Sequence, residues 1–209
     1  MVKKLILFDL DGTLIENETI DELAKINNVE DEVKKITKEA MAGNLNFEQS
    51  LKKRVSFLKG IPEDKALNTV NNLKITNGAF ETIKSLKENG HIVGVVSGGF
   101  TIATDEIKKL LNLDYSFANK LIVENNKLTG DVVGKVMKDN AKGEILKEIC
   151  EKENINLENT VVVGDGANDI SMFKIAGFKI AFCAKDKLKK YANVCVDKRD
   201  LREILKYIE

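Results

Sequence analysis

Three short runs of apolar or β-branched residues in this 209-residue chain each end abruptly in small or polar residues. They cover residues 5–8, residues 93–96 (interrupted only by Gly94) and residues 160–163. Continuous runs of this length are typical of parallel strands that are buried on both faces. Because open α/β sheets bind ligands at the carboxyl ends of their strands, the residues after these runs are the candidate site.

The polar residues that follow the three runs form three motifs. These are Asp9-Leu10-Asp11-Gly12-Thr13, Ser97-Gly98-Gly99 and Gly164-Asp165-Gly166-Ala167-Asn168-Asp169. Two acids at the end of a buried strand cost free energy unless their negative charges are neutralised, and a bound divalent cation is the simplest way to neutralise them. Taken singly, the motifs can also be interpreted as a solvated loop, an ordinary turn and a calcium-type loop. Together, each after a strand-like run, they favour one shared crevice.

Between the first and second runs, the apolar residues change to helical spacing. Residues 16–73 are rich in charge and contain four such groups, the last of which is opened by Pro62, the only proline. This segment is too long to be the single crossover helix of a βαβ unit. We therefore expect an inserted helical subdomain, residues 15–75, over the carboxyl ends of an α/β core formed by residues 1–14 and 76–209.

Helices and strands alternate after the insertion. We expect helices over residues 78–88, 101–111, 140–153, 169–176 and 201–208, and strands over residues 91–96, 160–163, 179–183 and 194–196. Residues 121–123 and 128–133, joined by residues 124–127, predict a β-hairpin. The predicted fold class is α/β, with a Rossmann-like parallel sheet flanked by helices and an inserted helical-bundle cap.

Composition narrows the class of protein further. The 33 basic and 33 acidic residues balance, which argues against a general binder of nucleic acid or anionic membranes. The chain has no run of eighteen apolar residues and enters a strand directly after Lys3-Lys4, so we expect neither a membrane span nor a signal peptide. Cys150, Cys183 and Cys195 fit no disulfide or zinc pattern, which predicts core packing and a cytoplasmic location.

The residues available at the strand ends limit the chemistry. His91, the only histidine, stands at the start of a strand, so Ser-His-Asp and Cys-His schemes lack their base. Carboxylates remain: Asp9 could attack phosphorus, while Asp11 could protonate the leaving oxygen and then deprotonate water. A bound Mg²⁺, with Asp165 as a further oxygen ligand, would reduce the repulsion between Asp9 and a phosphate dianion, and Asp169 could steady the waters of the metal.

A transferred phosphoryl group also needs donors around its oxygens. Ser97 offers a hydroxyl, and Gly98 and Gly99 offer backbone N–H groups that we expect at a helix N-terminus. Lys142, near the start of a predicted helix, could add a positive charge. Among 30 lysines, however, a solvated side chain is the plainer interpretation of Lys142.

These motifs resemble those of the haloacid dehalogenase-like phosphatases. Residues 9–13 match the nucleophile motif of that family, residues 96–100 the second motif, Lys142 the third and residues 164–169 the fourth. The resemblance covers nearly the whole chain, including the helical insertion. It implies a Mg²⁺-dependent phosphomonoesterase that works through an aspartyl-phosphate.

The resemblance also implies a role for each motif residue. Asp9 would be the nucleophile and a metal ligand, Asp11 the proton donor and acceptor with a backbone carbonyl on the metal, and Asp165 the remaining protein ligand. The phosphoryl group and substrate would be held by Ser97, Gly98, Lys142 and Asn168. Asp169 would support Lys142 or the metal shell.

Substrate choice would rest on the insertion. The resemblance implies O-phospho-L-serine as the small-molecule substrate, in the final step of serine biosynthesis, with Glu18 on its ammonium and Arg54 on its carboxylate. A planar guanidinium grips a carboxylate in a bidentate way that lysine cannot. Without the resemblance, Arg54 is a surface charge and Glu18 an acid favoured by a helix dipole. Met41 and Phe47 would form an apolar wall, although such residues are more often core.

Two other interpretations stay open. One is a phosphatase or phosphotransferase with the same mechanism that acts on another small phosphomonoester. The other is a non-catalytic protein that binds phosphate or Mg²⁺ on this scaffold, against which the intact Asp9 and Asp11 pair argues. We expect a monomer or a homodimer.

Overall fold

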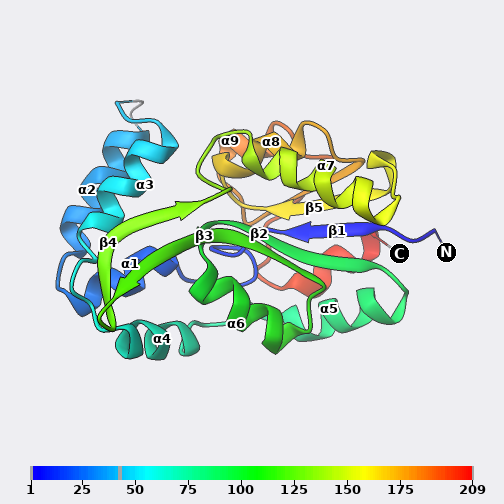
Figure 1. The fold of residues 1–209 in the computed structure, drawn as a ribbon. Helices are drawn as coiled ribbons and strands as arrows, with labels where there is room; N and C mark the ends of the chain where they lie inside the picture. Colours follow the sequence, from blue (N-terminus) through cyan, green and yellow to red (C-terminus); the bar gives the residue numbers. More distant parts are fainter. Residues whose placement is uncertain (1, 42–43, 209) are drawn as a thin grey trace.

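A seven-stranded sheet forms the centre of the protein (Figure 1), whose computed structural model describes residues 2–41 and 44–208. The strand order is β4-β3-β2-β1-β5-β6-β7, and all neighbours are parallel except the antiparallel pair β3 and β4. The bounds are β1 (Leu5–Phe8), β2 (Ile92–Phe100), β3 (Tyr115–Glu124), β4 (Lys127–Gly134), β5 (Thr160–Gly164), β6 (Phe178–Phe182) and β7 (Val194–Val196). The predicted α/β class with a mostly parallel sheet is confirmed.

The central position of β1 follows from its sequence. All four of its residues are apolar and fully buried, because helices cover both faces of the sheet. In the register, Phe8 pairs with Val95 of β2 and Val163 of β5. The backbone N–H of Asp9 continues the ladder by donating to the carbonyl of Val163 at 2.9 Å. The residues that follow β1 and β5, together with the last residues of β2, therefore lie at the same edge of the sheet.

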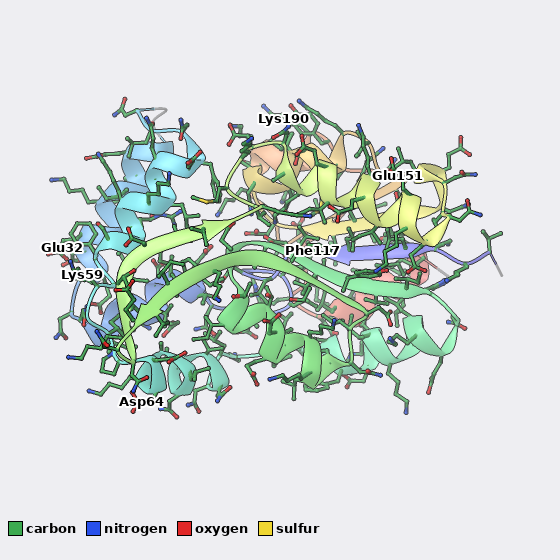
Figure 2. The ribbon with its side chains drawn as sticks, viewed as in Figure 1. Glu32, Lys59, Asp64, Phe117, Glu151 and Lys190 are labelled. Carbon is green, nitrogen blue, oxygen red and sulfur yellow. The ribbon has the colours of Figure 1, made fainter. Side chains whose placement is uncertain are left out.

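Helices form one layer on each face of the sheet (Figure 1). Ile6 and Phe8 point into a core shared with α5 (Ala79–Glu88), α6 (Thr101–Leu111) and a 3₁₀ helix (Leu201–Tyr207). Leu5 and Leu7 point into the opposite core, which is closed by α7 (Ala141–Glu153), α8 (Ile170–Phe173) and α9 (Asp186–Lys189). Charged side chains such as Glu32, Lys59, Asp64, Glu151 and Lys190 extend outward from this body (Figure 2).

The four helices that the structure describes in the insertion lie beyond the carboxyl ends of the parallel strands (Figure 1). They are α1 (Thr19–Ile26), α2 (Glu30–Met41), α3 (Phe47–Ser56) and α4 (Glu63–Asn71). Leu23, Val33 and Leu51 form a separate core there with Leu121 and Val132 of the β3–β4 hairpin. The helices are confirmed, and the hairpin shares their core. The domain boundaries at residues 14/15 and 75/76 stay a prediction.

Several local predictions need correction. The closing helix over residues 201–208 is a 3₁₀ helix. The hairpin turn has two residues rather than four, because Asn125 and Asn126 both adopt left-handed φ values, 50° and 58°, which suit a tight two-residue turn. The helix predicted over residues 169–176 begins as a 3₁₀ turn at Ala167–Asp169, and its α-helical part is only α8.

The cysteines and the histidine divide between core and surface. Cys150 is buried as predicted, whereas Cys183 is half-buried and Cys195 is exposed, because β7 is an edge strand with one open face. The prediction of core packing is therefore wrong for Cys195. His91 is buried, and its Nδ1 accepts a hydrogen bond from the backbone N–H of Lys4 at 3.3 Å. Among the described residues, we find no helix with the length and apolar character of a membrane span.

Gly78 offers a test of how the core is joined to its C-terminal segment. Gly78 has a φ of +76°, and a Cβ there would overlap the Asp200 carboxylate and lie 2.8 Å from Cγ of Arg202. Gly60 is a matched control, since its φ is +85° but no atom lies within 4 Å of a Cβ. We expect Gly60→Ala to lower the unfolding free energy by about 1 kcal/mol through backbone strain. Overpacking should make the loss for Gly78→Ala larger by about 1–3 kcal/mol. Urea unfolding measures both, and equal losses would contradict the proposed contact.

Candidate active site

Asp9 is a buried carboxylate at the carboxyl end of β1. Its relative exposure is 2%. Its Oδ1 accepts hydrogen bonds from the backbone N–H of Leu10 at 2.8 Å and from Nζ of Lys142 at 2.7 Å. Its Oδ2 faces Nδ2 of Asn168 at 3.5 Å. One oxygen is thus held by two strong donors, while the other has a long contact with Asn168 and is less constrained.

Lys142, in the first turn of α7, is as deeply buried as Asp9. Its Nζ lies 2.7 Å from Asp9 and 2.6 Å from Asp169. Burial by itself would lower the pKa of Lys142, but the two carboxylates outweigh it and raise the pKa, so the side chain stays charged. The interpretation of Lys142 as a solvated lysine is therefore wrong. Gly143 lets α7 pack closely against the backbone of Ser171, since a Cβ at this position would lie 2.8 Å from the carbonyl oxygen of Ser171.

Asp169 connects Lys142 with the loop that carries Asp165. Its Oδ1 accepts the bond from Lys142, and its Oδ2 accepts the backbone N–H groups of Asp165 and Gly166, each at 3.1 Å. Gly164 leaves room for this carboxylate, since a Cβ there would overlap it. Burial and the charge of Asp9 raise the pKa of Asp169, while Lys142 opposes that rise. Both oxygens of Asp169 are thus already engaged within the protein.

The Ser97-Gly98-Gly99 motif lies in a bulge of β2 and not after the strand, which corrects the prediction. Val96 pairs with Phe117 of β3 (labelled in Figure 2), yet Phe100 pairs with Asn119, so three residues of β2 lie opposite one residue of β3. The N–H of Gly99 donates to Oγ of Ser97 at 2.8 Å. Because α6 begins only at Thr101, these N–H groups belong to the bulge and not to the helix N-terminus.

Asp11 joins the core to the insertion. Its Oδ1 accepts the backbone N–H and the Oγ1 hydroxyl of Thr19, both at 2.6 Å, and its Oδ2 accepts Oγ of Ser97 at 3.2 Å. Asp11 therefore caps α1, whereas the N-cap residue Glu18 makes no side-chain capping bond. Burial and the nearby charge of Asp9 raise the pKa of Asp11, and the bonds from Thr19 and Ser97 partly oppose this.

The insertion brings two opposite charges to the rim of this crevice. Glu18 is open to solvent, yet desolvation and the charges of Asp11 and Asp165 raise its pKa. Arg54 is half-buried in α3, where its Nε donates to the carbonyl of Ser50 at 3.4 Å and its charge interacts most strongly with Glu18. Each group thus lies where a charged ligand of opposite sign would stabilise it.

Phe47, the first residue of α3, covers the backbone of the β2 bulge. A Cβ at Gly98 would lie only 2.7 Å from Cζ of Phe47, so the ring and the glycine backbone are in direct contact. This contact requires glycine at position 98 and lays an apolar surface over the bulge. Met41 ends α2, but its side chain lies outside the described part of the chain, so its predicted role stays a prediction.

The acidic residues fit a divalent cation. Asp9, Asp165 and Asp169 can place oxygens within 4.8 Å of one another. Since both oxygens of Asp169 are engaged, Asp9 and Asp165 are the better side-chain ligands, and hard oxygens suit Mg²⁺. The carboxylate of Asp11 is taken up by Thr19 and Ser97, which leaves its backbone carbonyl for the predicted metal role. Gly12, at φ +74°, allows close approach, as a Cβ there would lie 2.8 Å from Oδ2 of Asp165.

Sequence reasoning missed three residues that the structure places at this site. Thr19 holds Asp11, Asn119 bonds to Gly98, and Nζ of Lys185 lies 3.9 Å from Oδ2 of Asp165. Thr19 had a usable signal, because it directly follows Glu18 at a predicted helix start. Asn119 and Lys185 had none, since their contacts join segments that are distant in sequence.

The comparisons with known proteins agree with this geometry. The pattern that defines haloacid dehalogenase-like hydrolases matches residues 3–177, and the chain belongs to this family. Phosphoserine phosphatase of Methanocaldococcus jannaschii is 66% identical over 207 residues, which cover 99% of this chain and 98% of that protein. Within the family, the chain therefore belongs to the phosphoserine phosphatases, of the type found in archaea.

The chain is also similar to other relatives and to solved structures. The Campylobacter jejuni phosphoserine phosphatase is 43% identical over 98% of this chain and 99% of its own. The Archaeoglobus fulgidus enzyme is 48% identical, but the chain spans only 58% of its length. A solved phospho-aspartyl intermediate analogue of phosphoserine phosphatase is 65% identical, with a TM-score of 0.95 over the full length of both chains. A substrate-bound phosphoserine phosphatase complex is 64% identical, with the same TM-score and coverage.

Proposed function

We propose that this protein hydrolyses O-phospho-L-serine to L-serine and phosphate through an aspartyl-phosphate on Asp9. The observation that carries the proposal is the setting of Asp9, a buried carboxylate paired with Lys142 on one oxygen and less constrained on the other. The names of the similar proteins support it, since one solved relative is a phospho-aspartyl intermediate analogue and another a substrate-bound phosphoserine phosphatase.

In the first step, an oxygen of Asp9 forms a bond to phosphorus while the bond from phosphorus to the serine oxygen breaks. Asp11 gives its proton to that leaving oxygen, so that serine departs as a neutral alcohol. The ammonium of Lys142 lies 2.7 Å from Asp9 and stabilises negative charge on its carboxylate. The hydroxyl of Ser97, which donates to Asp11 in the structure, would turn toward the phosphoryl group, and backbone N–H groups of the β2 bulge would donate to the same group.

In the second step, water attacks the aspartyl-phosphate. Asp11, now ionised, takes a proton from the water while the water oxygen bonds to phosphorus. The bond between phosphorus and the carboxylate oxygen of Asp9 breaks at the same time. Phosphate leaves, and Asp9 returns to its carboxylate form. If another alcohol took the place of water, the same residues would catalyse phosphotransfer, which is the alternative function.

Asp9, Asp165 and the backbone carbonyl of Asp11 would hold Mg²⁺. The cation would offset the negative charge that a phosphate dianion brings to this acidic crevice. Phosphate release from O-phosphoserine with Mg²⁺, without it and with a chelator tests this dependence. Calorimetric titration of Mg²⁺ into the wild-type protein and an Asp165→Asn variant tests the ligand separately from turnover.

Specificity would come from the opposite charges of the insertion. Glu18 would pair with the substrate ammonium, which relieves its repulsion by Asp11 and Asp165. The guanidinium of Arg54 would grip the substrate carboxylate, and Phe47 would exclude water over the bulge. Rates of phosphate release from O-phospho-L-serine, O-phosphothreonine and sugar phosphates test this selection. Equal rates on all three would overturn the roles of Glu18 and Arg54 but leave the phosphoryl chemistry intact.

An Arg54→Lys variant separates recognition of the amino acid from recognition of phosphate. We expect kcat/KM for O-phosphoserine to fall by an amount that corresponds to a loss of about 1.5–3 kcal/mol in transition-state stabilisation, the value of a charge-assisted contact. The fall in kcat/KM for p-nitrophenyl phosphate should be much smaller. Lys53→Arg, at the exposed neighbouring position, is the matched control and should change neither substrate. Uniform loss on both substrates would mean that Arg54 acts only in the structure of α3.

A cytoplasmic location and a monomeric or homodimeric state stay predictions. Size-exclusion chromatography with light scattering tests the oligomeric state directly.

A further inference from the structure

Asn119 is a fully buried amide whose hydrogen bonds cross from one part of the site to another. It lies on β3 with a relative exposure of 0%. Its Nδ2 donates to the carbonyl of Gly98 at 3.0 Å and to the carbonyl of Val136 at 3.1 Å. Its Oδ1 accepts the backbone N–H of Val136 at 3.0 Å. A buried polar side chain with three such partners has a defined orientation.

The bulge in β2 explains why an amide is needed there. With three residues of β2 opposite one residue of β3, the backbone groups of residues 97–99 leave the regular ladder. The side chain of Asn119 supplies a donor to the carbonyl of Gly98 in place of a strand neighbour. Gly134, its partner in β4, gives it space, because a Cβ there would lie 2.7 Å from Cα of Asn119.

The peptide between Gly98 and Gly99 is therefore fixed at both ends. Its carbonyl accepts from Asn119, and its N–H donates to Oγ of Ser97. This fixes the direction of the backbone donors in the bulge. The other bonds of Asn119 hold Val136 in the segment that leads into α7, which carries Lys142. One side chain thus joins the bulge to the approach of the buried lysine.

We propose that Asn119 is a positioning residue that orients the phosphate-binding backbone of the β2 bulge and keeps it in register with Lys142. The proposal rests on the proposed function, because it assumes that the bulge holds the phosphoryl group. An amide suits this role because it donates twice and accepts once at the same time. An ionised aspartate accepts only, and alanine leaves all three backbone groups of its partners without a bond.

Inorganic phosphate is the probe that isolates this role. In Asn119→Asp and Asn119→Ala, we expect the inhibition constant for phosphate and KM for O-phosphoserine to rise about tenfold or more, because the loop must be ordered when phosphate binds. Inhibition by L-serine, which would contact Glu18 and Arg54 instead, should change by less than about twofold. Folded Asn119 variants with wild-type inhibition by phosphate would overturn the proposal. An equal weakening of inhibition by phosphate and by L-serine would also overturn the proposal, since it would indicate a general structural defect.

Thr160→Val is the matched control for loss of a buried side chain that makes two hydrogen bonds. Thr160 is 1% exposed at the amino end of β5, where its Oγ1 donates to the carbonyl of Leu157 and accepts the N–H of Gly177. We expect this variant to lose stability while inhibition by phosphate stays within about twofold of wild type. A change in phosphate inhibition as large as that of the Asn119 variants would contradict a specific role for Asn119.

A measurement on the wild-type protein covers the case in which the Asn119 variants do not fold. Phosphate bound at the bulge should slow hydrogen exchange of the Val136 N–H several-fold, because Asn119 links that group to Gly98. The Gly177 N–H, which donates to Thr160, should not change. If phosphate binds and the Val136 N–H is unaffected, the inference about Asn119 fails. If phosphate neither binds nor inhibits the wild-type protein, the proposed phosphate site itself fails.

Discussion

An Asp9→Asn variant should lose kcat on O-phosphoserine by roughly 10⁴-fold or more, as removal of a nucleophile generally does. The amide has nearly the same shape as the carboxylate, so the packing around β1 should persist. It is a poor nucleophile, because its nitrogen and oxygen carry no full negative charge. Lys142 keeps one partner in this variant, since Nζ also lies 2.6 Å from Asp169. The fall in kcat should therefore come from the missing nucleophile and not from unfolding of the protein.

Asp114→Asn is the control for this substitution. Asp114 accepts the N–H of Val93 at 2.9 Å and pairs with Lys87, near the amino end of the sheet and away from the crevice. We expect this variant to keep wild-type kcat while it loses some stability. Substantial turnover by Asp9→Asn, with Asp114→Asn as a reference for folding, would end the assignment of Asp9 as nucleophile.

Replacement of Lys142 by methionine should affect both stability and turnover. The change leaves the carboxylates of Asp9 and Asp169 buried without their shared cation. Breaking a buried ion pair on one side typically costs about 3–5 kcal/mol of unfolding free energy. We expect kcat to fall by about 10³-fold or more as well, because a positive charge beside the reacting group is lost.

The pH dependence of stability distinguishes this electrostatic cause from a packing defect. Burial and the charge of Asp9 already raise the pKa of Asp169, and without the opposing charge of Lys142 we expect it to rise further above its unfolded value. A buried carboxylate with a raised pKa destabilises the fold at a pH where it is ionised, so the loss in unfolding free energy of Lys142→Met relative to wild type should shrink as the pH falls. Urea unfolding of both proteins across a pH series measures this loss. Lys147→Met, at an exposed position of the same helix, should show no deficit, and a pH-independent deficit in Lys142→Met would contradict the account.

The central strands and the order of the motifs could be predicted because their signals are local. The run from Leu5 to Phe8 is apolar without a break, which only a strand covered on both faces requires. The helices of the insertion were similarly readable from apolar residues at helical spacing, and Asn46 with Gln49 marks the start of α3 by a reciprocal capping box. Each of these signals depends on neighbours within a few residues.

The features that could not be predicted depend on contacts between distant segments. Lys142 is buried because Asp9, 133 residues away in sequence, lies beside it, and no local pattern distinguishes it from a solvated lysine. The bulge in β2 requires knowledge of the β3 register, because the glycines alone also suit a turn after the strand. Asp11 caps α1 from a position eight residues before Thr19, and we did not predict this capping bond from the sequence. The geometry of the candidate site thus depends mainly on tertiary contacts between segments that are distant in sequence.

The most direct test of the account is chemical trapping of the covalent intermediate. Enzyme that is turning over ³²P-labelled O-phosphoserine is quenched rapidly in acid, digested and mapped. We expect label on the peptide that contains Asp9, stable in acid and released by hydroxylamine, as an acyl phosphate is. Undiminished turnover with no labelled peptide at that position would contradict the account.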